Sequence, residues 1–262
     1  MDSQLKKEFV KRINNIDRSK HIYRIFDDFL ELAYCALAKP AYMQWGDQER
    51  ADKLEAQWEK VVDRYPSHQF VQEEFGSLLG IVVEGVSNGG EFLGEVAGEL
   101  GALNESAGQY FTPYNVSKMM AQMLYTPDEI KRLIDKKRYI LLGEPACGAG
   151  GMVIAFAEMM REQGFYLPMR LLVQAVDISP TAYYMTYIQL TLLNIPAMVV
   201  LGNSLTLEVR TSALTLATYE FYCWRGHLFN EPVDEITIDV PPTPQPDFII
   251  RTHQLSLFDF GD

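Results

Sequence analysis

The chain has 262 residues, of which 48% are hydrophobic and 22% charged, and its formal net charge at pH 7 is −12. These values predict a globular protein with an ordinary core, and the acidic charge argues against a protein held on nucleic acid by charge alone. The three cysteines and four histidines are scattered, which predicts neither a disulfide framework nor a metal site. We find no apolar run of about 18 residues and no secretion signal, so we expect a cytoplasmic protein without a membrane span.

The first hundred residues have the pattern of helices. Lys39 and Pro40 predict the end of one of them, and Gly89-Gly90 interrupts the apolar spacing later in the chain. We therefore expect a helical lobe over residues 1–106, for which packing or oligomerisation is the plain explanation. The helical spacing of apolar residues covers 22–38, 48–63 and 70–86.

From residue 108 onward, strand and helix patterns alternate. The turn GQYFTPYNV leads into the helix VSKMMAQML. Strands that alternate with helices of about 10–15 residues indicate βαβ units and a parallel sheet. The predicted strands are RYILLGE, MRLLVQAVDI and AMVVLGN, and the helices between them are GMVIAFAEMMREQ and PTAYYMTYIQLTLLN. The alternation fails from 208, where TYEFYCW is compatible with another strand and VPPTPQPD with an extended linker.

Small residues fill the turn GEPACGAGGM at 143–152, between the first predicted strand and its helix. The turn lacks the Lys-Ser/Thr of a Walker phosphate loop and the GxGxxG spacing of a dinucleotide fold. A plain glycine turn and a loop for S-adenosylmethionine remain. Gly143, Asp177 and Asn203 all end predicted strands, and ligands of such sheets lie outside the carboxyl ends of the strands. These three ends favour one small nucleotide-like ligand.

Four segments resemble the adenine-N6 DNA methyltransferases, especially the modification subunits of type I restriction systems. They are GQYFTPYNV, EPACGAGGM, AVDISP and LGNSL, in the order that the family has them. The resemblance covers roughly residues 20–205. It implies an α/β, Rossmann-like S-adenosylmethionine-dependent methyltransferase fold, a parallel sheet with flanking helices, preceded by the helical lobe. We place this cofactor-binding domain at 107–240, and a proline-rich linker with a C-terminal peptide at 241–262.

The resemblance also implies S-adenosyl-L-methionine as the cofactor and a role for eleven residues. The methionine end would be lined by Tyr110, Phe111, Thr112 and Pro113. The amino-acid and ribose parts would be surrounded by Glu144, Ala146, Gly148 and Gly150. Asp177 would bind the ribose hydroxyls, Ile178 would pack on the adenine, and Asn203 would lie at the polar edge of the adenine. An ammonium and a sulfonium favour nearby carboxylates, and glycines allow close backbone approach. Core packing remains an alternative for Tyr110 and Phe111, and a helix N-cap for Asp177.

The catalytic motif of that family is missing or degenerate. Adenine-N6 methyltransferases carry Asp/Asn-Pro-Pro-aromatic, whose polar atoms accept hydrogen bonds from the target amino group and whose ring stacks on the flipped base. The weak candidates are Asn230 with Pro232, in LFNEPVDE, and Asp239 in DVPPT, and neither has the aromatic. Only 32 residues follow Asn230, and nine acidic residues face three arginines from 201 onward. We expect a catalytically impaired or partner-dependent protein with weak or indirect DNA contact and a restriction-modification subunit as a candidate partner.

The C-terminal QLSLF resembles the short peptide by which bacterial proteins dock on the DNA sliding clamp. Its contact residues would be Gln254, Leu255, Leu257 and Phe258, held away from the body by the prolines before them. The alternation in LSLFDF also fits a final strand. The alternative function is therefore a non-catalytic interaction or anti-restriction module tethered to the clamp.

Overall fold

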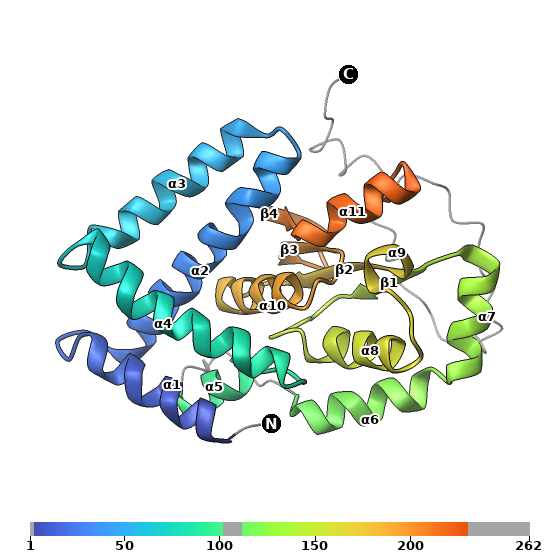
Figure 1. Cartoon of the computed structure of the whole chain (residues 1–262), viewed down its shortest axis with the longest axis horizontal. Helices are drawn as coiled ribbons and strands as arrows, with labels where there is room; N and C mark the ends of the chain where they lie inside the picture. The colour runs from blue at the N-terminus through green and yellow to red at the C-terminus, as the bar shows by residue number, and fades with distance from the viewer. Residues whose placement is uncertain (1–2, 102–111, 230–262) are drawn as a thin grey trace.

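The structure, a computed structural model, describes residues 3–101 and 112–229, which form a central sheet with helices around it and a helical lobe at one side (Figure 1). The helices of the lobe are α1 (Ser3–Ile16), α2 (Ile22–Gln44), α3 (Gln48–Val62), α4 (His68–Ser87) and α5 (Leu93–Glu99). The elements that follow are α6 (Tyr114–Leu124), α7 (Pro127–Lys137), β1 (Ile140–Glu144), α8 (Gly151–Glu162), α9 (Leu167–Arg170), β2 (Leu171–Asp177), α10 (Pro180–Leu192), β3 (Ala197–Asn203), β4 (Glu208–Leu214) and α11 (Leu216–Arg225).

The sheet has the spatial order β1-β2-β3-β4, in which β1, β2 and β3 are parallel and β4 is antiparallel to β3. The α/β fold class with flanking helices is confirmed, but the sheet is mixed rather than wholly parallel. Residues 204–207 are the whole connection from β3 to β4. A connection this short allows only an antiparallel neighbour, because a parallel one needs a crossover of a dozen or more residues.

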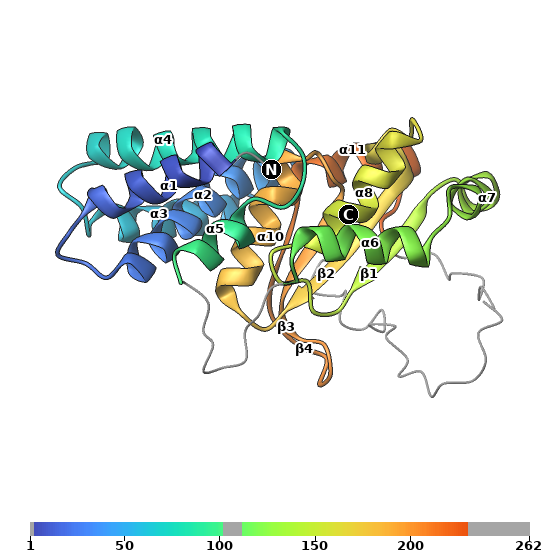
Figure 2. The ribbon, with the colours of Figure 1, turned by 90° about the horizontal axis from the view of Figure 1, so that it is seen from below.

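Helices α8 and α10 pack on one face of the sheet. Val173, Ala175 and Val199 point from the strands into the same core as Val153 of α8 and Tyr187 of α10. On the opposite face Val176, Met198, Val200 and Leu214 form a smaller apolar cluster, against which Trp45, Val209, Leu228 and Phe229 pack. The sheet therefore has apolar packing on both faces, and Figure 2 shows α8 and α10 beside the strands from below.

Helix α2 connects the lobe to the sheet. Its Phe26 lies in the core of the lobe, and its Tyr34 lies in the core of the sheet. The hydroxyls of Tyr34 and Tyr183 are 2.8 Å apart, and the Tyr42 hydroxyl donates to the carbonyl of Ser212 at 3.0 Å. Lobe and sheet thus share buried packing, while the predicted domain boundaries stay predictions.

Pro40 does not end α2, contrary to the sequence prediction. The helix continues through Pro40 to Gln44, although a proline inside a helix disfavours it by about 3 kcal/mol. Ala38, Ala41 and Tyr42 around the proline are all buried. Their burial, together with the bond from Tyr42 to β4, outweighs the local cost.

The segment TYEFYCW is not a strand, because it lies in α11. Its aromatic content is typical of strands, but Ala217, Thr218 and Phe221 are buried at helical spacing. Gly226 closes the helix with a φ of 84°, a conformation that glycine adopts without strain. Tertiary packing decides the element here, and the preceding strand β4 was not predicted at all.

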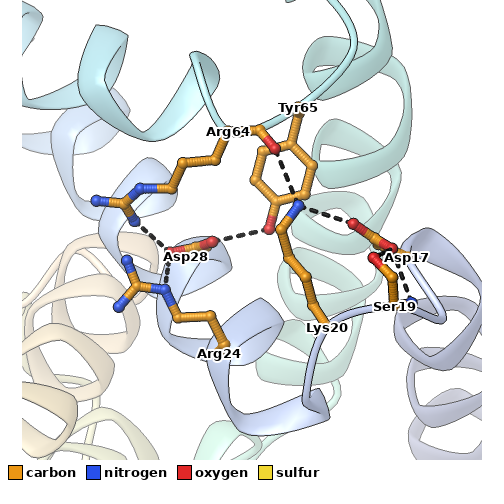
Figure 3. Close-up of polar contacts among 7 residues, drawn as sticks. All are labelled: Asp17, Ser19, Lys20, Arg24, Asp28, Arg64 and Tyr65. Carbon is orange, nitrogen blue, oxygen red and sulfur yellow. Dashed lines mark hydrogen bonds and ion pairs between the residues drawn. The ribbon is translucent and has the colours of Figure 1, made fainter.

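The buried carboxylate of Asp28 links α2 to the turn after α3 by hydrogen bonds (Figure 3). Asp28 is 1% exposed and accepts bonds from Arg64 at 2.5 Å and from the Tyr65 hydroxyl at 2.9 Å, with Arg24 at 3.2 Å. Burial and the neighbouring Asp28 raise the pKa of Tyr65, which therefore stays a hydrogen-bond donor. A carboxylate with three partners is satisfied, so this cluster serves the lobe rather than a ligand.

No helix among residues 3–101 and 112–229 is long and apolar enough to cross a membrane. The same described residues contain no group of three or more His, Cys, Asp or Glu side chains that could hold a metal ion.

Candidate functional site

The loop between β1 and α8 has a backbone that requires glycine at two positions. Gly148 has a φ of 55° and Gly150, the N-cap of α8, a φ of 90°. A Cβ at Gly150 would also lie 3.3 Å from the Thr186 hydroxyl. That hydroxyl donates to the carbonyl of Gly148 at 2.8 Å, and the Cys147 N–H donates to the carbonyl of Val176 at 2.9 Å. Strand β2 and helix α10 therefore fix the shape of the loop.

Asp177, at the end of β2, is bonded directly to this loop. One carboxylate oxygen accepts from the Gly148 N–H at 2.9 Å, and the other accepts from the Ser179 N–H at 2.9 Å. The N-cap of α10 is Ser179, whose hydroxyl accepts from the Ala182 N–H, so Asp177 is not the helix cap that the sequence left as an alternative. Each carboxylate oxygen keeps a second lone pair, so Asp177 can still accept bonds from ligand hydroxyls.

Glu144 ends β1 and lines both cavities of this region. Burial raises the pKa of its carboxyl group, and the negative charge of Asp177 raises it further. The Ala146 N–H donates to Glu144 at 3.2 Å, which opposes the rise by favouring the ionised form. A cation bound beside Glu144 would favour its ionised form in the same way.

The smaller cavity, of about 70 Å³, lies along the glycine loop. It brings together four of the predicted site residues, Thr112, Glu144, Ala146 and Gly148. Its other lining residues are Glu91, Ser117, Cys147, Ala149, Gly151 and Met152. One water needs about 15 Å³ of such space, so the cavity accommodates a group of several heavy atoms and not a whole nucleoside.

The larger cavity, of about 160 Å³, lies where β1, β2 and β3 end. Val176, Val200 and Val209 give it an apolar wall, and Glu144 and Asn203 lie on its rim of polar residues. The Asn203 side-chain oxygen accepts from the N–H groups of Leu205 at 2.9 Å and Thr206 at 3.3 Å. These bonds fix the amide in the turn to β4 through its oxygen.

The remaining predicted residues are placed differently. Pro113 is exposed at the N-cap of α6, and Ile178, 53% exposed, follows Asp177 at the surface. Neither residue lines the two cavities, and neither do Gly150 and Asp177. Tyr110, Phe111, Asn230, Pro232, Gln254, Leu255, Leu257 and Phe258 lie outside the described residues, so their assigned roles stay predictions.

Six residues that line the smaller cavity were not among the predicted site residues; four belong to the loop and the start of α8, and Glu91 and Ser117 come from other segments. Glu91 follows the glycine pair that interrupts the helix pattern, and it precedes the apolar Phe92-Leu93. A carboxylate beside apolar residues at a helix break is a signal that could have singled it out. Ser117 carries no comparable signal, because serine is ordinary on a surface helix.

Comparisons with known proteins agree with this geometry. A family model described as N-6 DNA Methylase matches residues 92–217, and no curated protein matches the chain. Among solved structures, a protein of Listeria monocytogenes described as a class I S-adenosylmethionine-dependent methyltransferase is 11% identical, with a TM-score of 0.35, over 85% of this chain and 71% of that one. At that TM-score and identity, the likeness does not establish a shared fold or function. The family match includes the glycine loop, Asp177 and Asn203, as the resemblance predicted. Residues 92–217 of this chain are therefore similar to the N-6 DNA methylase family.

Proposed function

We propose that the loop between β1 and α8 binds S-adenosyl-L-methionine. The observation that carries this proposal is the bond from the Gly148 N–H to Asp177, which joins the glycine loop to the acid at the end of the next parallel strand. A ligand at the carboxyl ends of such strands meets both the close backbone of the loop and the carboxylate. The family match over the same residues supports the same cofactor.

The two cavities and the exposed strand ends suit different parts of that cofactor. Asp177 accepts from the ribose hydroxyls, and Ile178 offers its exposed side chain to the adenine. Asn203 lies one strand further along the sheet, at the polar edge of the base. The smaller cavity, bounded by Thr112 and Gly148, is of a size for the amino-acid end. The carboxylate of Glu144 lies near the sulfonium and favours its positive charge.

We further propose that methyl transfer to DNA needs groups from a partner. The only Pro-Pro pair of the sequence, at 241–242, lies outside the described residues, and no aromatic follows it. Strand β1 is an edge of the sheet of the described residues, and its Leu141 is 45% exposed. Met119, Met120 and Met123 of α6 are exposed as well. Exposed apolar side chains of this kind are typical of surfaces that receive a partner.

This partner dependence is testable by methyl transfer to DNA. With labelled S-adenosylmethionine, the purified chain should label adenine-containing DNA at most at background, and addition of its native cell extract should restore labelling. Efficient transfer by the chain alone would overturn the dependence on a partner without affecting the proposed cofactor site.

The proposed cofactor site is tested by calorimetric titration of Asp177→Ala with S-adenosylhomocysteine. Loss of the carboxylate removes two acceptors for ribose hydroxyls, and hydrogen bonds to charged groups of this kind correspond to a weakening of about tenfold or more. Asp135→Ala, the same change on an exposed position of α7, is the matched control and should bind as the wild type does. Equal affinity of the Asp177 variant and the wild type would exclude this placement of the ribose.

A further inference from the structure

We propose that Glu91 and Ser117 bind the α-ammonium group at the amino-acid end of the cofactor. This inference rests on the proposed function, because it assigns a role within the same site. It concerns two residues from α6 and from the turn before α5, which neither the glycine loop nor the strand ends include.

Glu91 is held at the wall of the smaller cavity by buried hydrogen bonds. It is 4% exposed, and one carboxylate oxygen accepts both the Gly94 N–H and the Gln189 side-chain amide, the latter at 2.9 Å. The same amide of Gln189 donates to the carbonyl of Ala149 in the glycine loop at 2.7 Å. Gln189 thus fixes the carboxyl group of Glu91 against the loop. A carboxylate offers about four lone-pair positions, so acceptor capacity remains for a ligand.

Ser117 faces the same cavity from α6 with a hydroxyl that lacks a partner. The residue is 1% exposed, and its Oγ is buried without a hydrogen-bond partner among the described residues. A Cβ on Gly151 would lie 3.2 Å from this Oγ and 3.9 Å from Glu91 Cγ, so both side chains border the space that glycine leaves open. Buried hydroxyls are nearly always bonded, and a ligand group in the cavity would satisfy this one.

The charge of the lining selects a cation. Two carboxylates, Glu91 and Glu144, line the smaller cavity, and no lysine, arginine or histidine is among the residues that line it. Glu91 and Ser117 provide acceptors for the N–H donors of an ammonium group, and Glu144 adds a second negative charge to the lining. The amino-acid end of the cofactor carries such a group, whereas a metal ion would need more ligands than these described residues offer.

Burial raises the pKa of Glu91 to about 7, opposed in part by the Gly94 N–H and by Gln189. Four charged or titratable groups lie around Glu91: Glu95 on α5, Tyr114 on α6, and Glu144 and Cys147 of the loop. Glu95 is paired with Lys6 of α1, and Tyr114 is bonded to Glu158 of α8. Below pH 7 the empty site therefore holds Glu91 mainly in its neutral form. An ammonium beside it favours the carboxylate, so binding must release the proton.

The test compares two ligands and three forms of the full chain by calorimetry at pH 6, in two buffers of different ionisation enthalpy. S-adenosylhomocysteine carries the amino-acid end, and 5′-methylthioadenosine lacks it. We expect the wild type to release about one proton with the first ligand and none with the second. Glu91→Gln should bind S-adenosylhomocysteine at least about tenfold more weakly without proton release, and should bind methylthioadenosine unchanged. Glu73→Gln, the same charge change on an exposed position of α4, is the matched control and should behave as the wild type.

Unchanged affinity and proton release in Glu91→Gln would overturn the inference while the proposed function stood. Absence of binding of either ligand to the wild type would overturn the proposed function and this inference with it. Should Glu91→Gln fail to fold, the wild type decides: proton release with S-adenosylhomocysteine but not with methylthioadenosine supports the assignment, and equal release with both contradicts it.

Discussion

At the scale of single residues, the position of Glu91 depends on a glycine in a different helix. Gly85 of α4 lies against the ring of Phe92, so closely that a Cβ there would lie 2.3 Å from the ring. Phe92 is fully buried and immediately follows Glu91, and its N–H donates to Gln189 at 2.7 Å. The close contact at Gly85 therefore holds the turn that carries Glu91 against α10.

Alanine substitutions at two glycines of α4 should have opposite effects on stability. Gly85→Ala forces the Phe92 ring to move, and overpacking of this kind destabilises by about 1–3 kcal/mol. Gly80 lies in the same helix, and a Cβ added there would have no neighbouring group within 4 Å apart from the backbone of the helix itself. Gly80→Ala should therefore stabilise the protein by about 0.5–1 kcal/mol through helix propensity. Urea denaturation of both variants measures the difference, and a Gly85 variant as stable as the Gly80 variant would show that Phe92 does not pack as described.

Several site residues were predictable from the sequence because they lie at strand ends. Glu144, Asp177 and Asn203 follow apolar runs, and they are the last residues of β1, β2 and β3. The roles of Glu91 and Ser117 were not predictable, because they depend on packing between α5, α6 and the loop. No local pattern encodes that packing, which joins residues far apart in the sequence.

At the scale of elements, the periodicity of apolar residues was sufficient to predict the helices and strands whose buried residues follow a regular spacing. Strands β1, β2 and β3 and helices α8 and α10 lie where the sequence predicts them, because their apolar residues face one core. The predictions failed where long-range contacts override local preference. Helix α2 passes through Pro40 because Tyr42 is buried and bonded to β4. Strand β4 was missed because four of its seven residues are exposed or polar, which leaves a weak apolar pattern.

The position of the elements also explains the fixed shape of the loop after β1. The Thr186 hydroxyl of α10 donates to Gly148, and the Cys147 N–H donates to β2. Burial raises the pKa of the Cys147 thiol, so this cysteine stays protonated and serves packing rather than chemistry. A loop bonded to two neighbouring elements is preorganised for a ligand, which lowers the entropic cost of binding.

At the scale of the whole molecule, the proposed cofactor site draws on residues of both the sheet region and the lobe. The smaller cavity is lined by residues from the turn before α5, from α6 and from the loop after β1. Helix α2 contributes to the cores of both parts. The proposed site therefore combines residues from segments on both sides of this shared packing.

The net charge of −12 bears on the proposed methyl transfer to DNA. Phosphate contacts depend on lysine and arginine, and an acidic protein gains little from them. The acidic balance is thus consistent with the proposal that a partner holds the DNA and this chain holds the methyl donor.

The most direct test of the central claim is a crystal structure of the chain with S-adenosylhomocysteine at saturating concentration. We expect ligand density at the carboxyl ends of β1 and β2. The ribose hydroxyls should lie within hydrogen-bonding distance of Asp177, and the amino-acid end should lie in the cavity beside Gly148 and Thr112. Ligand density elsewhere on the molecule, or an empty glycine loop under those conditions, would contradict it.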